Sequence, residues 1–131
     1  MKQLNIKTNE RTEMLDITRR LQDIVNKENW QAGLLIVFVP HTTAAVTINE
    51  NADPDVQRDM LMEINKVIPF EDRYRHFEGN SAAHLKTSLF GASETIIVEN
   101  GQLKLGTWQG IYFCEFDGPR QRKIWLQFSG N

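Results

Sequence analysis

The chain contains three histidines, and imidazole is the side chain most often used to bind transition metals and to move protons near neutral pH. His41 directly follows the apolar run LLIVFVP, and His76 and His84 enclose the segment HFEGNSAAH. Three neutral imidazoles with an open fourth position form a known zinc arrangement, which holds a water molecule or polarises a substrate oxygen. The gaps of 35 and 8 residues match no compact metal motif. Two interpretations therefore stay open: a metal site, or partly buried histidines held by hydrogen bonds.

Two carboxylates are candidates for proton transfer. Glu50 lies in the segment TINENADPD, where helix capping explains Asp53 but gives Glu50 no structural role. Glu50 would serve as a general base or as a ligand for a hard cation if its loop folded back over His41, and is otherwise a solvated turn residue. Glu115 lies in a strand pattern that is apolar on both sides. An unpaired buried charge is costly, so Glu115 needs a partner.

Arg120 and Arg122 are the cations nearest to Glu115 across the turn DGPR. They have two interpretations. One is a tight turn with a cross-strand ion pair, and the other is a forked pair of guanidinium groups that receives a phosphate or a carboxylate. Cys114 alternates toward the aromatic face of the same strand, so we expect it in the core rather than as a nucleophile.

Asn80 or Ser81 is expected to cap a short helical pattern that follows. The free N–H groups and the positive dipole end of such a helix could also hold one anion. Common nucleotide and hydrolase chemistry is not supported, because the sequence has no Gly-rich phosphate loop, no G-x-S-x-G elbow and no C-x-x-C pair.

The first part of the chain alternates between strand and helix patterns. Residues 2–8 alternate as in a half-buried strand, and residues 11–17 are a candidate partner for it. Apolar spacings of three and four predict a helix that starts at 16–18 and ends near Asn29. The run 34–40 is too short for a core helix, so it is predicted as a strand covered on both faces.

Two further helices are predicted in the middle of the chain. Residues 41–52 indicate a turn, a short strand and a connection, and Asp53 followed by Pro54 starts the second helix. A third helix runs from residue 80 or 81 through Leu89, with Gly91 placed to end it. The positions of His76 and His84 relative to each other depend on the loop that precedes this helix.

From Glu94 the apolar period changes to two. Asn100-Gly101 between apolar runs is a strong hairpin signal, and the turn DGPR separates two further strand patterns. We therefore expect two consecutive hairpins, over residues 93–106 and 107–128. The class is α+β, with packed, mostly antiparallel sheets and about three helices.

Composition indicates one globular domain over residues 1–131. The 131 residues include 40% hydrophobic and 24% charged residues, and no linker or repeat divides them. A net charge of −2 argues against a nucleic-acid partner, and the longest apolar run is far too short to span a membrane. A single cysteine and the absence of a signal-peptide pattern lead us to expect the cytoplasm.

Three long segments resemble the YjbQ-like proteins, some of which are labelled secondary thiamine-phosphate synthase. The segments are PHTTAAVTINENADPDV (40–56), HFEGNSAAHLKTSLFG (76–91) and NGQLKLGTWQGIYFCEFDGPRQRKIWLQ (100–127). The resemblance covers essentially the whole chain. It implies a YjbQ-like fold, a homotrimer, and a polar pocket near a subunit boundary.

The resemblance also assigns roles to the candidate residues. It implies that His41, His76 and His84 bind a divalent metal, zinc or magnesium, or an anion. Asn80, Ser81, Glu115, Arg120 and Arg122 fall inside the matching segments with less specific roles.

Two functions follow from the resemblance. The first is a transferase-like enzyme acting on a small phosphorylated molecule, in which Arg120 and Arg122 hold phosphate and Glu50 or Glu115 moves a proton. The second is a non-catalytic homotrimer that binds a phosphorylated ligand or an anion, and it is motivated by the lack of a diphosphate-binding loop. Whether the chain is an enzyme stays open at this point.

Overall fold

The computed structural model describes all residues, 1–131, as eight strands and three helices. In chain order the elements are β1 (Lys2–Lys7), β2 (Glu13–Asp16), α1 (Thr18–Lys27), β3 (Gly33–Phe38), β4 (Ala44–Glu50), α2 (Pro54–Val67), α3 (Ser81–Phe90), β5 (Ser93–Glu99), β6 (Gln102–Leu103), β7 (Gln109–Glu115) and β8 (Gln121–Gly130). This arrangement confirms the α+β class and the three helices. No helix is long and apolar enough to cross a membrane.

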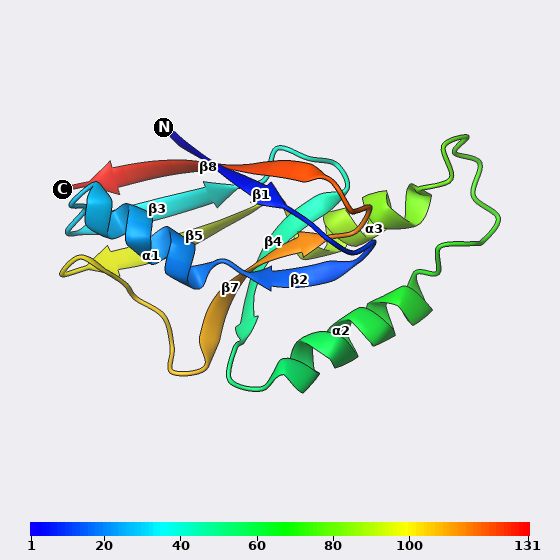
Figure 1. Cartoon of the computed structure of the whole chain (residues 1–131), viewed down its shortest axis with the longest axis horizontal. Coiled ribbons are helices and arrows are strands. Elements are labelled where there is room, and N and C mark those ends of the chain that lie inside the picture. The colour runs from blue at the N-terminus through cyan, green and yellow to red at the C-terminus, as the bar shows by residue number, and fades with distance from the viewer.

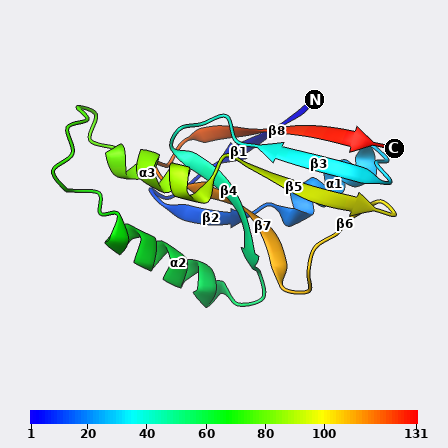
Figure 2. The same ribbon diagram turned by 180° about the vertical axis from the view of Figure 1, so that it is seen from behind.

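The strands form two antiparallel sheets. The five-stranded sheet has the order β1-β8-β3-β5-β6, and the three-stranded sheet has the order β2-β7-β4. In Figure 1, α1 lies in front of the larger sheet, while α2 and α3 lie on the side of the smaller sheet. The same arrangement seen from behind shows α2 beside β2, at the edge of the smaller sheet (Figure 2), and Leu61 of α2 packs against the core cluster on that side.

The main core lies between the larger sheet, α1 and one face of the smaller sheet. It contains Leu21 and Val25 from α1, and Ile111 and Phe113 from β7. The opposite face of β7 contributes Tyr112 and Cys114, and Phe116 directly after the strand joins them, in a second, smaller core cluster that includes Ala83 of α3. The alternation expected for this strand is therefore confirmed, and β7 is central in its sheet.

Local chemistry explains where α2 begins. The Asp53 side chain accepts a hydrogen bond of 2.9 Å from the backbone N–H of Asp55, and Pro54 occupies the first helical position. These features confirm the predicted start. No residue of α2 is buried, although Val56, Met60 and Ile64 lie half-buried on its predicted apolar face.

The β5–β6 hairpin also forms as expected. Asn100 and Gly101 both have positive φ, at 53° and 71°, as a two-residue hairpin turn requires.

The prediction that strand 34–40 is covered on both faces is wrong. Along β3, Leu35 and Val37 are fully buried, whereas Leu34, Ile36 and Phe38 are 46%, 38% and 40% exposed. The five-stranded sheet is covered by α1 and the smaller sheet on one face only. Its other face is open in the single chain, where Ile36 lies between Thr95 and Gln127, and its exposed apolar side chains are Leu34, Ile36, Phe38 and Ile97.

Two pairing predictions are also wrong. Residues 107–128 do not form a hairpin, because β7 joins the smaller sheet whereas β8 joins the larger one. The turn DGPR therefore connects two sheets. Similarly, β2 pairs with β7, and β1 pairs with β8, so the strand 2–8 does not pair with residues 11–17.

Candidate functional site

Two cavities open along α3, one toward each end of the helix, and His84 lines both. The N-terminal chamber, of about 510 Å³, is lined by Tyr74, His76, Ser81, His84 and Leu85. The C-terminal chamber, of about 480 Å³, is lined by His41, Thr42, His84, Thr87, Ser88, Gly91 and Ala92. All three histidines therefore lie on one continuous stretch of surface, and both volumes fall within the range of small-molecule sites.

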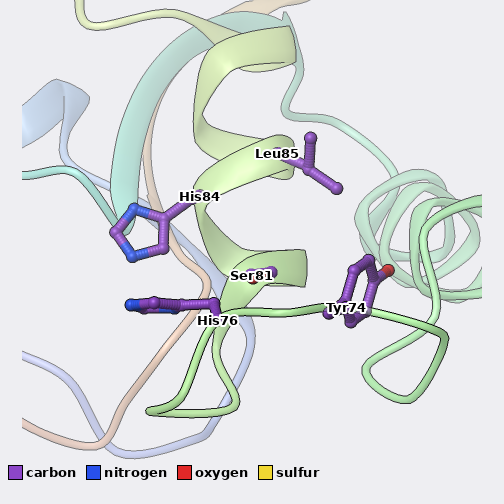
Figure 3. Close-up of a pocket in the computed structure, with 5 residues that line it drawn as sticks. All are labelled: Tyr74, His76, Ser81, His84 and Leu85. Carbon is purple, nitrogen blue, oxygen red and sulfur yellow. The ribbon is translucent and has the colours of Figure 1, made fainter.

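His76 and His84 form a pair at the start of α3. Their ring centroids lie 5.4 Å apart with an interplanar angle of 78°. In Figure 3 the two rings lie on the same side of the helix, while Tyr74 and Leu85 lie on the other. His84 is carried by α3, and His76 by the connection between α2 and α3. The loop before α3 therefore brings His76 next to His84, which the spacing of residues on the helix alone could not do.

The His76–His84 spacing fits a shared metal ion. Two imidazoles bound to one zinc ion at about 2.0 Å, with a tetrahedral angle between the bonds, have ring centroids roughly 5 Å apart. The nitrogen donors favour zinc over magnesium, which prefers oxygen ligands. No group of three His, Cys, Asp or Glu side chains is arranged to hold a metal ion.

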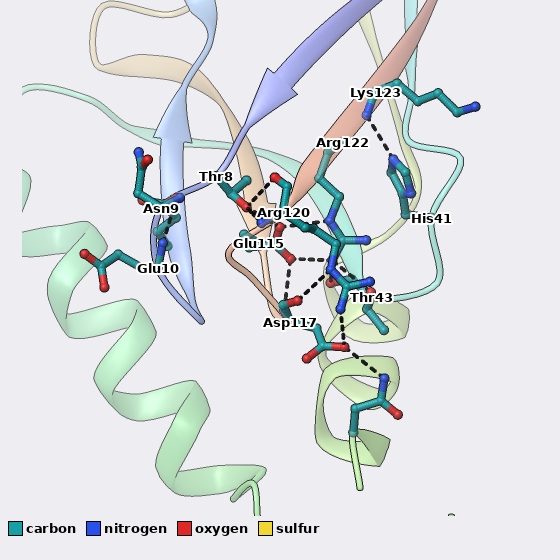
Figure 4. Close-up of polar contacts among 12 residues, drawn as sticks. Thr8, Asn9, Glu10, His41, Thr43, Glu115, Asp117, Arg120, Arg122 and Lys123 are labelled. Carbon is teal, nitrogen blue, oxygen red and sulfur yellow. Dashed lines mark hydrogen bonds and ion pairs between the residues drawn. The ribbon is translucent and has the colours of Figure 1, made fainter. Parts of the chain in front are cut away.

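His41 is held differently. Its Nε2 accepts a hydrogen bond of 3.0 Å from the backbone N–H of Lys123 (Figure 4). An accepting Nε2 means that the ring is neutral and that Nδ1 carries the proton. Burial lowers the pKa of His41, and the positive charge of Arg122 lowers it further. In this state the lone pair of Nε2 is engaged with the Lys123 N–H, and Nδ1 carries the only ring proton.

Several lining residues were not singled out from the sequence, namely Thr42, Tyr74, Leu85, Thr87 and Ser88. Ser81, Leu85 and Ser88 recur at helical spacing on one face of α3, so a helical projection of residues 81–90 would have found them. Thr42 and Tyr74 lie in loops and carry no such signal.

Asn80 does not cap α3 with its side chain. Its Nδ2 instead donates to Oδ2 of Asp117 at 2.9 Å, and the same oxygen accepts from Arg120 at 3.0 Å. The Asn80 Oδ1 atom is buried without a partner. Asn80 therefore connects the start of α3 to the turn after β7 through a hydrogen bond. Of these two residues, Ser81 is the one that lines the N-terminal chamber.

Glu115 and Arg122 form a buried ion pair between the two sheets. Their side chains are 0% and 3% exposed, and the guanidinium contacts both carboxylate oxygens. Arg122 also donates to the Thr43 hydroxyl, and Thr8 donates to Glu115 at 2.7 Å (Figure 4). Burial alone would raise the pKa of Glu115, but these hydrogen bonds and that from the Asp117 N–H more than offset it and lower the pKa. Of the two interpretations of this segment, the structure contains the ion pair, and the Arg122 guanidinium bonds to Glu115 and Thr43.

Glu50 does not approach His41. His41 lies three residues before β4 and Glu50 is the last residue of this seven-residue strand, which at about 3.3 Å per residue spans roughly 20 Å. The Glu50 carboxylate accepts from the backbone N–H of Ala52, so it shapes its own turn. Neither Glu50 nor Glu115 lines a chamber.

Lys86 anchors the connection between α2 and α3. The side chain is fully buried, its Nζ donates to Oδ1 of Asn65 at 2.6 Å, and it lies 3.6 Å from the centroid of the Phe70 ring. Arg11 lies at the same distance from that ring. Burial lowers the pKa of Lys86 to about 8, and the charge of Arg11 acts in the same direction. This cluster fixes the start of the loop that carries His76.

Comparison with known proteins agrees with this architecture. The family model described as "UPF0047 protein YjbQ-like" matches residues 2–131. The chain is 54% identical to "UPF0047 protein YugU" of Bacillus subtilis, over 99% of both chains. It is 48% identical to "UPF0047 protein MJ1081" of Methanocaldococcus jannaschii, over 96% of this chain and 91% of that protein.

A solved structure agrees equally well. The crystal structure of a YjbQ/UPF0047 family protein from Clostridium acetobutylicum is 52% identical and superimposes with a TM-score of 0.95. The match covers 98% of this chain and 100% of that chain. By sequence along its whole length and by fold, the chain belongs to the YjbQ-like UPF0047 family.

Proposed function

We propose that this protein is an enzyme that acts on a small phosphorylated molecule, whose phosphate lies in the N-terminal chamber. The observation that carries the proposal is the His76–His84 pair beside the first turn of α3. The start of a helix has free N–H groups and a positive dipole end, and the Ser81 hydroxyl lies at the same place. Together these groups suit a phosphate better than a neutral ligand.

A divalent metal bound by His76 and His84 would complete this site. Their 5.4 Å centroid spacing and their nitrogen donors fit zinc. When bound, such an ion neutralises phosphate charge and polarises an oxygen of the substrate. The chain's own groups then position the substrate: Ser81 donates to it, and His84 faces both chambers.

Metal analysis tests the first part of the proposal. Purified protein should bind zinc in near-stoichiometric amount, and both His76→Ala and His84→Ala should lose it while circular dichroism shows an unchanged fold. His41→Ala is the matched control and should retain zinc, because the Nε2 lone pair of His41 is already engaged with the Lys123 N–H. Zinc that stays bound in His84→Ala would refute this metal site.

The synthesis of thiamine phosphate belongs to the proposed reaction class. In that reaction a pyrimidine diphosphate joins a thiazole phosphate and diphosphate leaves, which needs positive charge on the leaving group. The direct assay mixes the two substrates with zinc-loaded protein and measures product. Turnover in the wild type that is lost in His84→Ala would support this reaction at the proposed site, whereas turnover unchanged by the substitution would exclude a role for His84 in it.

A non-catalytic binding protein is the second candidate. One observation favours it: no carboxylate lines either chamber, so only the histidines are placed to move a proton. A phosphorylated ligand that raises the melting temperature, but is recovered chemically unchanged, would support this candidate over the enzyme.

We also infer that the chain assembles into a homotrimer. Leu34, Ile36, Phe38 and Ile97 are 38–55% exposed on neighbouring strands β3 and β5. A contiguous apolar sheet face of this kind is characteristic of an interaction surface. Phe38 also stacks on Trp125 of β8, which extends this face across a third strand.

A further inference from the structure

The ammonium group of Lys86 is buried without a carboxylate partner. The residue is 0% exposed, and none of the ion pairs in the chain includes it. Its Nζ donates to the Asn65 amide oxygen at 2.6 Å and lies 3.6 Å from the centroid of the Phe70 ring. Removing an ammonium group from water is costly, and an apolar side chain of similar volume is often at least as stable in such a place. The burial of Lys86 therefore indicates a role other than stability.

The two contacts of Lys86 join the end of α2 to the connection that follows it, residues 68–80. Asn65 lies in the last turn of α2, and Phe70 lies three residues after the helix ends. Away from water, an amide oxygen and an aromatic ring both bind an ammonium group more strongly than they do on the surface. Arg11 also lies over the Phe70 ring, at 3.6 Å from its centroid. The first residues of the connection are therefore held in a defined place.

The rest of the connection depends on this beginning. Tyr74 and His76 line the N-terminal chamber, and the Tyr74 hydroxyl donates to the carbonyl oxygen of Pro69 at 2.6 Å, directly beside Phe70. Phe77 is 102% exposed, so the residue after His76 provides no packing contact that could hold the connection there. The position of the His76 ring is therefore set by the ends of the connection rather than by its middle.

Helix α3 carries both Lys86 and His84. Positions two residues apart on an α-helix point about 200° away from each other, so the two side chains lie on opposite sides of α3. One side of the helix thus holds the beginning of the connection, and the other side presents the imidazole that meets His76 at 5.4 Å between ring centroids. A shift of the connection against α3 would change this distance without unfolding the helix.

We propose that Lys86 is a positioning residue for the histidine pair: its buried ammonium group holds the connection 68–80 where His76 lies beside His84. The inference rests on the proposed function, which assigns zinc to this pair. Groups that orient metal ligands without touching the metal typically change metal affinity by about ten- to a hundredfold when they are removed. Lys86 should therefore be required for tight zinc binding, although its side chain lines neither chamber.

Zinc affinity, measured at pH 7 by competition with a chromophoric chelator, tests this role. Lys86→Met keeps an unbranched side chain without the charge, and it should weaken zinc binding by about tenfold or more, with unchanged circular dichroism. Phe70→Leu removes the ring and should also weaken zinc binding. Phe70→Tyr keeps an aromatic face for the ammonium group and should bind zinc as the wild type does.

Two control variants exclude simpler explanations. Lys66→Met removes an exposed positive charge from the last turn of α2 and should not weaken zinc binding. Loss of a positive charge by itself favours a bound cation, so a decrease in Lys86→Met has the opposite sign to a charge effect. Val25→Ala removes buried volume from α1, in the main core, and should lower the melting temperature but keep the zinc affinity.

The visible absorption of bound cobalt provides a second readout, because it reports the geometry of the ligands. At saturating cobalt the spectrum of Lys86→Met should differ from that of the wild type, whereas Lys66→Met and Val25→Ala should reproduce the wild-type spectrum.

The results separate this inference from the proposed function. Zinc affinity and a cobalt spectrum that stay at wild-type values in Lys86→Met would overturn the positioning role and leave the zinc site standing. An equal loss of affinity in either control variant would overturn it as well. If Lys86→Met does not fold, wild-type affinity in Phe70→Leu is the overturning result. A wild-type protein that binds no zinc would overturn the proposed zinc site together with this inference.

Discussion

His41 Nε2 accepts a hydrogen bond of 3.0 Å from the backbone N–H of Lys123, which joins the loop after β3 to strand β8. The bond needs a neutral imidazole, and burial lowers the pKa of His41 below 6.5. The unfolded chain therefore binds more protons than the folded one between the lowered pKa and 6.5, and stability rises with pH over that window.

The first prediction concerns this histidine. The free energy of unfolding of the wild type should fall as the pH is lowered below 6.5. The part of this decrease that is due to His41 should end once the pH is below the pKa of His41 in the folded chain. His41→Gln, which cannot titrate, should lack this component. Urea denaturation of both proteins at several values from pH 7.5 to 4.5 measures it, and parallel curves for the two proteins would contradict it.

The second prediction concerns the Glu115–Arg122 pair. Arg122→Met leaves a fully buried carboxylate without its cation, so the free energy of unfolding should fall by about 3–5 kcal/mol at pH 7. Arg120→Met is the matched control, because its ion pair with Asp117 is partly exposed, and it should cost less than about 1 kcal/mol. Chemical denaturation measures both changes in the free energy of unfolding. Equal decreases for the two variants would show that burial of the ion pair does not determine how much stability its removal costs.

Acid should weaken the same pair. The folded pKa of Glu115 is lowered, so its stabilising contribution is present above its unfolded pKa and is lost as the pH falls through the folded value. A Glu115→Gln/Arg122→Met double variant should lack this acid-dependent loss in the same denaturation experiment.

The third prediction concerns Lys86. Its pKa is about 8 in the folded chain and 10.5 in the reference state, so the unfolded chain binds more protons between these values. The free energy of unfolding should therefore rise with pH across this window, by at most about 1.4 kcal/mol per pH unit, relative to Lys86→Met. Denaturant titrations from pH 7 to 10 measure the difference. A wild-type curve that falls relative to the variant would contradict the assigned direction.

The fourth prediction concerns the proposed assembly. If the chain is a trimer through the open face of the larger sheet, Ile36→Lys places a charge on that face and should shift the protein to monomer at micromolar concentration, with its circular dichroism unchanged. Met62→Lys is the control, because Met62 is 62% exposed on α2, away from this sheet. Sedimentation velocity distinguishes the species, and a wild-type protein that sediments as a monomer would refute the trimer.

The sequence by itself determined the features that depend on neighbouring residues. Asp53 and Pro54 start α2, Asn100 and Gly101 turn the β5–β6 hairpin, and the alternation through residues 109–116 divides β7 between two core clusters. Caps, turns and alternation are energetic preferences of a few adjacent residues, so they can be inferred without knowing the fold. The burial of Cys114 follows from the same alternation.

Only the tertiary structure decided which surfaces meet. It placed β7 and β8 in different sheets, left one side of β3 open, kept Glu50 far from His41, and brought His84 between His41 and His76. These outcomes depend on pairings between segments that are tens of residues apart, where many arrangements satisfy the same local pattern. The energy that selects one of them comes from burying whole faces against each other, and the sequence of one strand or one helix does not specify its partner.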